Sequence, residues 1–514
     1  MARYKEYSYE QGKLIPISFH KQIIPGSFEF ALNDIVDNVL DLSVFEGRFC
    51  NDETGAPAYN PRILLKIILY AYSRGVLHSR DIARCCTENV MFMALSADTQ
   101  PHFTTIAHFV SSMEGEITPL FRNILLYCAE EKLISRDMFA IDGCKISSNC
   151  AKEWSGTIED FKKRKEKIEY QVRFLLRKHK ECDKTQLGDT IIKKEKKAIN
   201  HLRSKVKKIN RWLAKNKDKA GKCGLKKSNI TDNETAKMQS SHGIIQGYNA
   251  GAAVDEKHQV IVHAETFSDG NDQGLLKPMI DGVRDNFKAI GENDIFSQAK
   301  ITADSGFHSD ANMKMLFEEN IDGYVADNQF RKRDPKFASA DRHKKPIDRK
   351  HTPLWKKNFF GPDDFIYDET TKKLTCPAGN PLYVRNSKLI TKKGQRGIVY
   401  VGWKTKCRTC EIRSKCLRSP KSEFRQVVKF DKSTMGPKGT FTKQMIEKFD
   451  SALGRFIYSR RMGTVEPVFA NICHTIGLDR FTLRTRKKAD TQWKLFSIVH
   501  NIFKIYRFGP TYAH

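Results

Sequence analysis

The sequence predicts an α/β protein with a mixed β-sheet, preceded by an all-α domain. Three observations lead to this prediction. Apolar residues recur at helical spacing over residues 1–135. Beyond them, short apolar runs typical of strands alternate with helical patterns. After the first strand and a charged interruption, the order is strand, strand, helix, strand, helix, strand, which is typical of a sheet with an antiparallel, hairpin-built side and a parallel side.

Composition narrows the class of protein. The chain has 514 residues, of which 40% are hydrophobic, so it can bury a substantial core and wholesale disorder is excluded. A mean hydropathy of -0.53 and the lack of long apolar runs exclude membrane spans. The start, MARYKEYSYEQGK, has no apolar signal segment, so we expect a cytoplasmic protein. Lys and Arg outnumber Asp and Glu by 89 to 60, and this net charge of +29 favours nucleic acid as the partner.

The amino-terminal segment contains three helix signals. Pro61 suits a first helical turn, and apolar residues follow it at helical spacing up to Tyr72. Ser79 is expected to cap a second helix, and Thr104 or Thr105 a third. Short helices around tight turns suit a helix-turn-helix DNA-binding module, with a dimerisation or packing domain as the alternative.

Two aspartates follow predicted strands of the α/β part. Residues 138–141 form an apolar run that ends at Asp142, and the run Lys300–Ala303 ends at Asp304. Ligands bind at the carboxyl ends of strands in such sheets, so we expect the two side chains to meet there. Paired carboxylates suit Mg²⁺ or Mn²⁺, whereas a single aspartate at a strand end more often caps a turn.

A third carboxylate is available near the carboxyl terminus. Thr464 is expected to cap a helix with Pro467 in its first turn, because proline is tolerated only there. Glu466 would then stand at the start of this helix and could complete a metal site. The alternative is a first-turn glutamate that the helix dipole stabilises.

A strongly basic segment interrupts the α/β part. Residues 161–220 hold 22 Lys and Arg against 7 Asp and Glu, a net charge of +15. Within it, apolar residues step by three and four, which is typical of packed helices; they are Ile199, Leu202, Val206, Ile209 and Leu213. We predict an antiparallel helical hairpin that contacts DNA phosphates through Lys193, Lys194, Lys196 and Lys197. A solvated helix face is the alternative.

Four of the 13 cysteines cluster in a later segment. Cys376 precedes Cys407, Cys410 and Cys416, and the Cys407-X-X-Cys410 spacing is typical of tetrahedral zinc sites. Alternating apolar residues just before Cys407 fit a small zinc ribbon. Four reduced structural cysteines are the alternative, and the odd total argues against a disulfide framework.

Several motifs carry a resemblance to a known family. The segments FAIDG (139–143), GYNAGAAVDE (247–256), ITADSGF (301–307) and RMGTVEPVFANI (461–472) together resemble the DDE transposases of bacterial insertion sequences, of the insertion-sequence-five-like group. The upstream stretch YNPRILLKIILYAYSRGVLHSRDIAR resembles their amino-terminal helical domain.

The resemblance implies a function. It implies an RNase H-like core in which Asp142, Asp304 and Glu466 are catalytic and bind Mg²⁺ or Mn²⁺. The enzyme would cleave double-stranded DNA at the terminal inverted repeats of its insertion sequence and transfer the ends into target DNA. It would act as at least a homodimer on DNA, associated with the bacterial nucleoid.

The resemblance is incomplete around the glutamate. Tyr458 and Arg461 lie one residue further upstream than in the family pattern, and Cys473 takes the place of a downstream basic residue. We therefore expect Arg460, Arg461 or His474 to hold the DNA end. Two alternative functions remain: a DNA-binding protein of the same fold that no longer cuts, and a nuclease without strand transfer.

The predicted organisation has six parts. They are an amino-terminal helical DNA-binding or dimerisation domain (1–135), the first strand of the catalytic core (136–158), the inserted basic hairpin (159–227), the continued core (228–328), a basic and Cys-rich insertion (329–435) and the carboxyl-terminal helical part of the core (436–514). The Cys-rich insertion includes a basic stretch, residues 332–357, that is expected to contact DNA.

Overall fold

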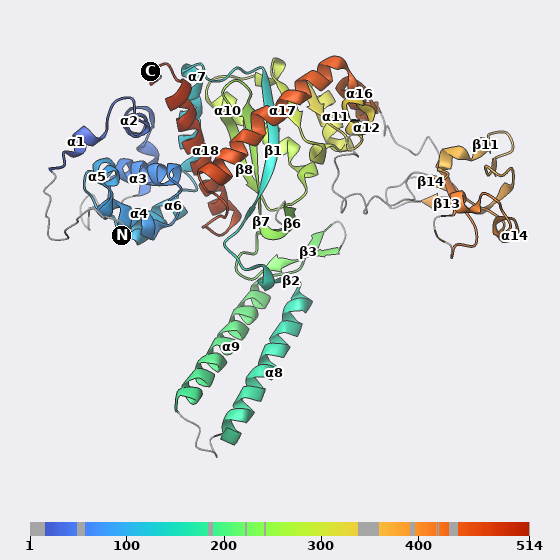
Figure 1. Cartoon of the computed structure of the whole chain (residues 1–514), viewed down its shortest axis with the longest axis horizontal. Coiled ribbons are helices and arrows are strands. Elements are labelled where there is room, and N and C mark those ends of the chain that lie inside the picture. The colour runs from blue at the N-terminus through green and yellow to red at the C-terminus, as the bar shows by residue number, and fades with distance from the viewer. Residues whose placement is uncertain are drawn as a thin grey trace, which may run out of the picture. The chain divides into compact units, whose positions relative to one another are not determined.

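The computed structural model describes most of the chain (Figure 1). The described residues are 16–48, 57–182, 189–221, 224–240, 243–337, 359–390, 396–417, 419, 421–430 and 440–512. The chain forms two compact units, one made of Met1–Ala326 with Ala452–His514 and the other of Asp327–Ser451. No described helix is both long and apolar enough to cross a membrane.

The larger unit is built around a six-stranded mixed sheet. Its strands are β1 (Met138–Ser147), β6 (Ala236–Ser240), β7 (Gly243–Asp255), β8 (Ile261–Phe267), β9 (Lys300–Ala303) and β10 (Gly323–Val325). Their order is β10-β9-β1-β7-β6, and β8 also pairs with β7. Strand β9 runs parallel to β1 and β10, whereas β7 is antiparallel to β1, β6 and β8. The predicted mixed sheet is therefore confirmed.

Strand β1 is longer than predicted. The parallel pairing with β9 ends at Ile141, as the apolar run indicated, but β1 continues to Ser147 because β7 pairs with it over that whole length. The prediction that the strand ends at Asp142 is therefore wrong. Asp142 instead marks the point at which β1 loses its parallel neighbour.

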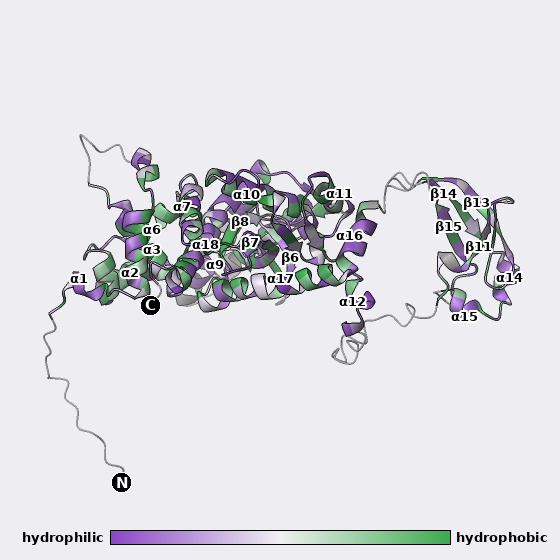
Figure 2. Cartoon of the chain, turned by 90° about the horizontal axis from the view of Figure 1, so that it is seen from above, coloured by the Kyte–Doolittle hydropathy of each residue, from purple (hydrophilic) through white to green (hydrophobic). Residues whose placement is uncertain are grey.

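Helices cover both faces of the sheet. They are α10 (Leu276–Ala289), α11 (Asp310–Glu318), α17 (Ala452–Ala470) and α18 (Arg486–Phe508), with the short turns η4 (Asp272–Gly274), η5 (Ile295–Ser297), η6 (Ser305–Phe307) and η11 (Asn471–Thr475). The ring of Phe139 packs on Phe287 of α10, whereas Asp142, which alternates to the opposite face, meets α17. Figure 2 shows β7 and β8 in the interior of this unit between α10 and α17, and β7 is buried from Gln246 to Asp255.

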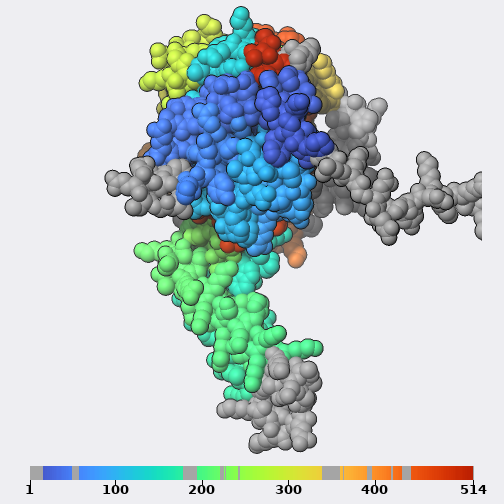
Figure 3. Space-filling model, turned by 90° about the vertical axis from the view of Figure 1, so that its left-hand side faces the viewer, coloured from blue at the N-terminus to red at the C-terminus, as the bar shows by residue number. Residues whose placement is uncertain are grey.

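The amino-terminal segment is helical, as predicted. Its elements are α1 (Phe19–Gln22), α2 (Phe28–Asp34), η1 (Ile35–Val39), η2 (Ser43–Arg48), α3 (Pro61–Ser73), α4 (Ser79–Glu88), α5 (Val90–Leu95), α6 (Phe103–Ser111) and α7 (Ile117–Glu130). Tyr72 of α3 stacks on Phe496 of α18, with 4.6 Å between ring centroids. Figure 3 shows these helices as one packed surface, and they belong to the same compact unit as the sheet.

Two predicted helix caps in this segment are wrong. Ser79 is the first residue of α4 rather than its cap, because the helix begins directly after His78. Helix α6 begins at Phe103, and its cap is His102, whose Nδ1 accepts a hydrogen bond from the Thr104 N–H. His102 therefore supplies the capping acceptor that was predicted to come from Thr104 or Thr105.

The basic segment forms the predicted pair of helices. They are α8 (Ile158–Cys182) and α9 (Asp189–Lys215), and their base carries η3 (Lys152–Trp154) and the short strands β2 (Ser155–Gly156), β3 (Lys219–Gly221), β4 (Gly224–Lys226) and β5 (Ser228–Asn229). Ile199 and Ile209 are buried between the helices with Phe161, Ile168, Val172 and Trp212. The turn around Gly188 lies outside the described residues.

The smaller unit contains a five-stranded antiparallel sheet in the order β11-β12-β13-β14-β15. These strands are β11 (Ile366–Asp368), β12 (Lys373–Thr375), β13 (Pro381–Ile390), β14 (Arg396–Val401) and β15 (Gln426–Phe430), accompanied by α12 (Phe330–Arg333), η7 (Pro335–Phe337), η10 (Pro362–Asp364), α14 (Lys404–Arg408), α15 (Arg413–Cys416) and α16 (Thr440–Asp450). Most of the basic stretch 332–357 lies outside the described residues.

Candidate active site

Asp142 and Asp304 lie close together, as the sequence indicated, at the point where the parallel pairing of β1 with β9 ends. Ile141 of β1 pairs in parallel register with Ala303 of β9, so the two aspartates follow paired residues. In each, Oδ1 accepts a hydrogen bond from the next backbone N–H, at 2.8 Å for Asp142 and 2.6 Å for Asp304. Each aspartate therefore caps the backbone that follows it, and the two carboxylates also lie close together.

The second oxygens of the two carboxylates differ. Oδ2 of Asp142 accepts a hydrogen bond from Nη1 of Arg461 at 2.8 Å. Oδ2 of Asp304 has no hydrogen-bond partner among the described residues. One oxygen of the pair is thus held by a guanidinium and one is open to a further cation or to a substrate group.

Burial and charge determine the protonation of Asp142. Burial raises the pKa of Asp142, the nearby Arg461 opposes this shift, and the charge of Asp304 adds to it. The effect of Asp304 shows that the carboxylates lie close enough to repel each other. A cation between them would favour the ionised form of Asp142.

Arg461 is part of this site rather than of the protein surface. It is only 6% exposed, and its guanidinium carbon lies 5.6 Å from the ring centre of Tyr458. Burial lowers the pKa of Arg461, but the interactions with Asp142, Tyr458 and Asp304 together outweigh burial, and the pKa is raised overall. Burial also raises the pKa of Tyr458, so the phenol is a neutral neighbour of the pair.

Glu466 does not join the aspartates in this structure. Helix α17 begins at Ala452 and runs through Thr464 without a break, so Thr464 is not a cap and Pro467 lies inside the helix. Glu466 lies five positions after Arg461, which turns the glutamate roughly 140° around the helix axis. Glu466 is accordingly exposed while Arg461, Val465 and Val468 are buried.

The predicted DNA-binding residues occupy different environments. Arg460 is half exposed and pairs with Glu256 at 2.8 Å, whereas His474 is exposed and Arg461 is committed to Asp142. Lys194, Lys196 and Lys197 are exposed on α9. The side chain of Lys193 lies outside the described residues.

A polar network on the opposite face of β1 was not predicted. Asp272, in η4, accepts hydrogen bonds from Asn249 at 2.6 Å and from Lys145 at 3.2 Å. A Cβ atom on Gly306 would lie 3.0 Å from the Asp272 carboxylate, so this network abuts the turn that Asp304 caps. The sequence contains one signal for this network: Lys145 alternates with Asp142 and Cys144 along the strand, so its side chain lies on the opposite face of the sheet.

A thiol pair also lies close to Asp142. The sulfurs of Cys144, on β1, and Cys473, in η11, are 3.7 Å apart. Their contact lowers the pKa of Cys144 and raises that of Cys473. Cys473, which stands where the family pattern noted above has a basic residue, thus belongs to a half-buried thiol pair.

The four clustered cysteines line one cavity of the smaller unit. Burial raises the pKa of Cys416, which Arg425 opposes and the three other cysteines reinforce. Within the described part of the chain, however, no three His, Cys, Asp or Glu side chains already form a metal-binding group. This holds for the cysteines and for the carboxylates alike.

Comparison with known proteins gives two family matches. Residues 375–506 match the transposase DDE domain, a segment that contains the four clustered cysteines, Arg461 and Glu466. Residues 17–112, which comprise α1 to α6, match a second family described as transposase domain (DUF772). No curated protein matches the chain.

Proposed function

From the premise that this chain belongs to the DDE transposases of insertion sequences, as its two domain matches indicate, we propose that it cleaves DNA at the ends of its element and joins them to target DNA. The observation that carries this proposal is that Asp142 and Asp304 directly follow Ile141 and Ala303, which are paired on adjoining parallel strands. Two carboxylates in such a position suit metal-dependent phosphoryl chemistry.

The strand order supports an RNase H-like core. Along the chain, β1, β7 and β8 form the antiparallel side, and β9 and β10 add in parallel on the other edge of β1. Asp142 then lies on the central strand, and Asp304 directly follows its parallel neighbour β9. This arrangement is the one that the sequence resemblance implies for the catalytic core.

The donor set fits a divalent cation. Asp142 and Asp304 would hold Mg²⁺ or Mn²⁺ with carboxylate oxygens, the ligands that these ions prefer. Such an ion, when bound, would activate a water and neutralise charge on the phosphate. We propose Glu466 as the third carboxylate, which requires α17 to present its exposed face to the DNA-bound site.

The residues of the chain have separable tasks in this scheme. Asp142 and Asp304 provide the negative charge that places the cation at the scissile phosphate. Arg461 holds Asp142 through a charge-assisted hydrogen bond and thereby orients its carboxylate. In-line displacement needs positioning and charge stabilisation only, so no side chain is proposed to form a covalent bond with DNA.

Cleavage of the element's own ends tests the proposal. Purified protein is incubated with labelled DNA from the flanks of its gene, with Mg²⁺ or with EDTA. We expect strand cuts at the terminal repeats with Mg²⁺ only, followed by joined products when target DNA is added. Binding without cutting would favour a DNA-binding protein that has lost activity, and cutting without joining a nuclease.

The basic helices are proposed to contact DNA phosphates. Replacing Lys194, Lys196 and Lys197 by Glu should weaken DNA binding and flatten its salt dependence. Each lost phosphate contact lowers the slope of log K against log salt by about 0.9. Fluorescence anisotropy at several salt concentrations measures this slope.

Three exposed lysines elsewhere provide the matched control. The same charge reversal at Lys257, Lys288 and Lys314, which lie in the sheet region, should leave the salt slope within error of the parent protein. If the α9 variant and the parent protein had equal slopes, the lysines of α9 would face solvent and would not contact DNA phosphates.

A further inference from the structure

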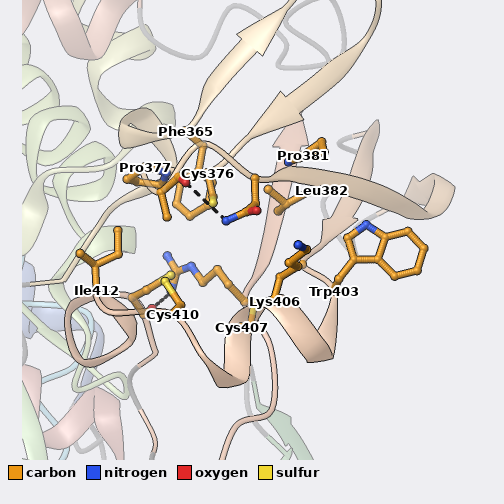
Figure 4. Close-up of a pocket in the computed structure, with 15 residues that line it drawn as sticks. Phe365, Cys376, Pro377, Pro381, Leu382, Trp403, Lys406, Cys407, Cys410 and Ile412 are labelled. Carbon is orange, nitrogen blue, oxygen red and sulfur yellow. Dashed lines mark hydrogen bonds between the residues drawn. The ribbon is translucent and has the colours of Figure 1, made fainter.

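A small cavity in the Asp327–Ser451 unit is surrounded by cysteines (Figure 4). Cys376 lines it from the turn after β12, Cys407 from α14, Cys410 from the turn after α14, and Cys416 from the end of α15. The cavity measures about 30 Å³. A space of this size admits a water or a single ion but not a substrate-sized molecule.

We propose that Cys376, Cys407, Cys410 and Cys416 bind one zinc ion. Four thiolates favour zinc because it prefers tetrahedral sulfur coordination in closed structural sites. The sulfurs line the cavity without converging on one point, so binding draws them together. Each coordinating thiol gives its proton to solvent as its bond to the metal forms.

The backbone is shaped to place two of these sulfurs. Gly379 has a φ of +76°, and its N–H donates to the carbonyl oxygen of Cys376 at 2.8 Å. The tight turn from Cys376 to Gly379 directs the Cys376 side chain into the cavity. Near α14, a Cβ atom on Gly402 would lie 2.8 Å from Sγ of Cys407, so only glycine leaves room for this sulfur.

Arg425 supplies a charge that four thiolates would need. Its Nε is buried and has no hydrogen-bond partner, although its Nη1 donates to the Cys416 carbonyl at 3.3 Å and its Nη2 to the Phe360 carbonyl at 2.9 Å. A zinc ion with four thiolates carries two excess negative charges. A neighbouring guanidinium offsets that charge, and a thiolate provides the acceptor that Nε lacks.

The cavity lies beside a small hydrophobic cluster. Among the described residues, this cluster contains five buried side chains, Phe365, Leu374, Leu382, Tyr400 and Val427, with Cys376 and Cys416 packed against them. Small domains with cores of this size usually depend on a metal, on disulfides or on association. A zinc ion would tie the turn after β12 to the two short helices.

Metal analysis of the full-length protein tests the site. Protein purified under reducing conditions without chelator should contain about one zinc per chain. The double variant Cys407→Ser and Cys410→Ser should lose it, whereas Cys85→Ser, on the amino-terminal helix α4, should retain it. In zinc-depleted protein, Co²⁺ should produce the intense visible bands of a tetrahedral thiolate site.

Three results would overturn the proposal. The first is protein with reduced thiols but neither zinc nor a tetrahedral Co²⁺ spectrum, and the second is zinc retained in the double variant. The third is a disulfide between these cysteines, which thiol titration would detect. Gly402→Ala leaves all four ligands in place and should weaken zinc binding tenfold or more; unchanged affinity would contradict the crowding of Cys407. None of these readouts depends on DNA cleavage.

Discussion

Replacing Asp142 or Asp304 by Asn should reduce Mg²⁺-dependent cleavage of element-end DNA at least a thousandfold. Asparagine keeps the shape of the side chain but removes the charge that holds the cation. A thousandfold loss corresponds to about 4 kcal/mol of transition-state stabilisation, a typical result when a catalytic group is removed. The measurement is single-turnover cleavage of labelled DNA, with DNA affinity measured in parallel.

The expected pattern includes a third variant and a control. Glu466→Gln should lose cleavage to a similar extent without loss of stability, because the side chain is exposed. Asp281→Asn removes the same charge from a surface ion pair on α10 and should cleave normally. Full activity in Glu466→Gln would reduce the catalytic set to the two aspartates. Metal-dependent cleavage in all three variants would refute the assignment.

The central sheet could be predicted because its signals are local. The apolar run at 138–141 and Lys300–Ala303 each lie in a strand with buried neighbours, and a carboxylate follows each run. Burial of consecutive apolar residues leaves few other structures for such runs. Because the carboxyl ends of parallel strands meet at one edge of a sheet, the sequence also predicted that Asp142 and Asp304 lie close together.

The environment of Glu466 could not be predicted because it depends on where α17 begins. A helix that starts at Thr464 would present Glu466 in its first turn. The observed helix starts twelve residues earlier and continues through Pro467, so its buried stripe includes Arg461, Val465 and Val468. The face that a residue occupies is determined by packing over the whole helix, and no local cap signal contains that information.

The same reason explains why the pairing of Arg461 with Asp142 was missed. The two residues are 319 positions apart, and an arginine in a basic chain is usually a surface residue. The sequence predicted Arg461 as a DNA contact, but its burial in the larger unit depends on how α17 crosses β1. Long-range partners of this kind follow from tertiary structure alone.

Removing the guanidinium of Arg461 should destabilise the larger unit strongly at neutral and alkaline pH. In Arg461→Leu, Asp142 keeps its buried position and loses its partner. Breaking a buried ion pair by removing one member costs about 3–5 kcal/mol. Urea unfolding measures the difference in unfolding free energy; it is followed by tryptophan fluorescence, to which the buried Trp493 of the larger unit contributes. Arg461→Lys should recover part of it.

The loss of stability in Arg461→Leu should depend on pH in a defined direction. Burial raises the pKa of Asp142 in the folded protein, and Arg461 lowers it, so the pKa rises further without the guanidinium. A raised pKa means that the folded state binds the proton more tightly than the unfolded chain, and stability falls as the pH rises through that pKa. The destabilisation of Arg461→Leu should therefore be larger at about pH 8 than at about pH 5.

A surface arginine separates this effect from a general loss of charge. Arg84, on α4, pairs with Asp81 and Glu88, and its side chain is 62% exposed. Arg84→Leu should cost under about 1 kcal/mol and show little pH dependence over the same range. If Arg461→Leu were no less stable than Arg84→Leu, or if its deficit grew on acidification, Asp142 would not depend on Arg461 as its counter-ion. The pairing would then be irrelevant to how the carboxylate is held for a cation.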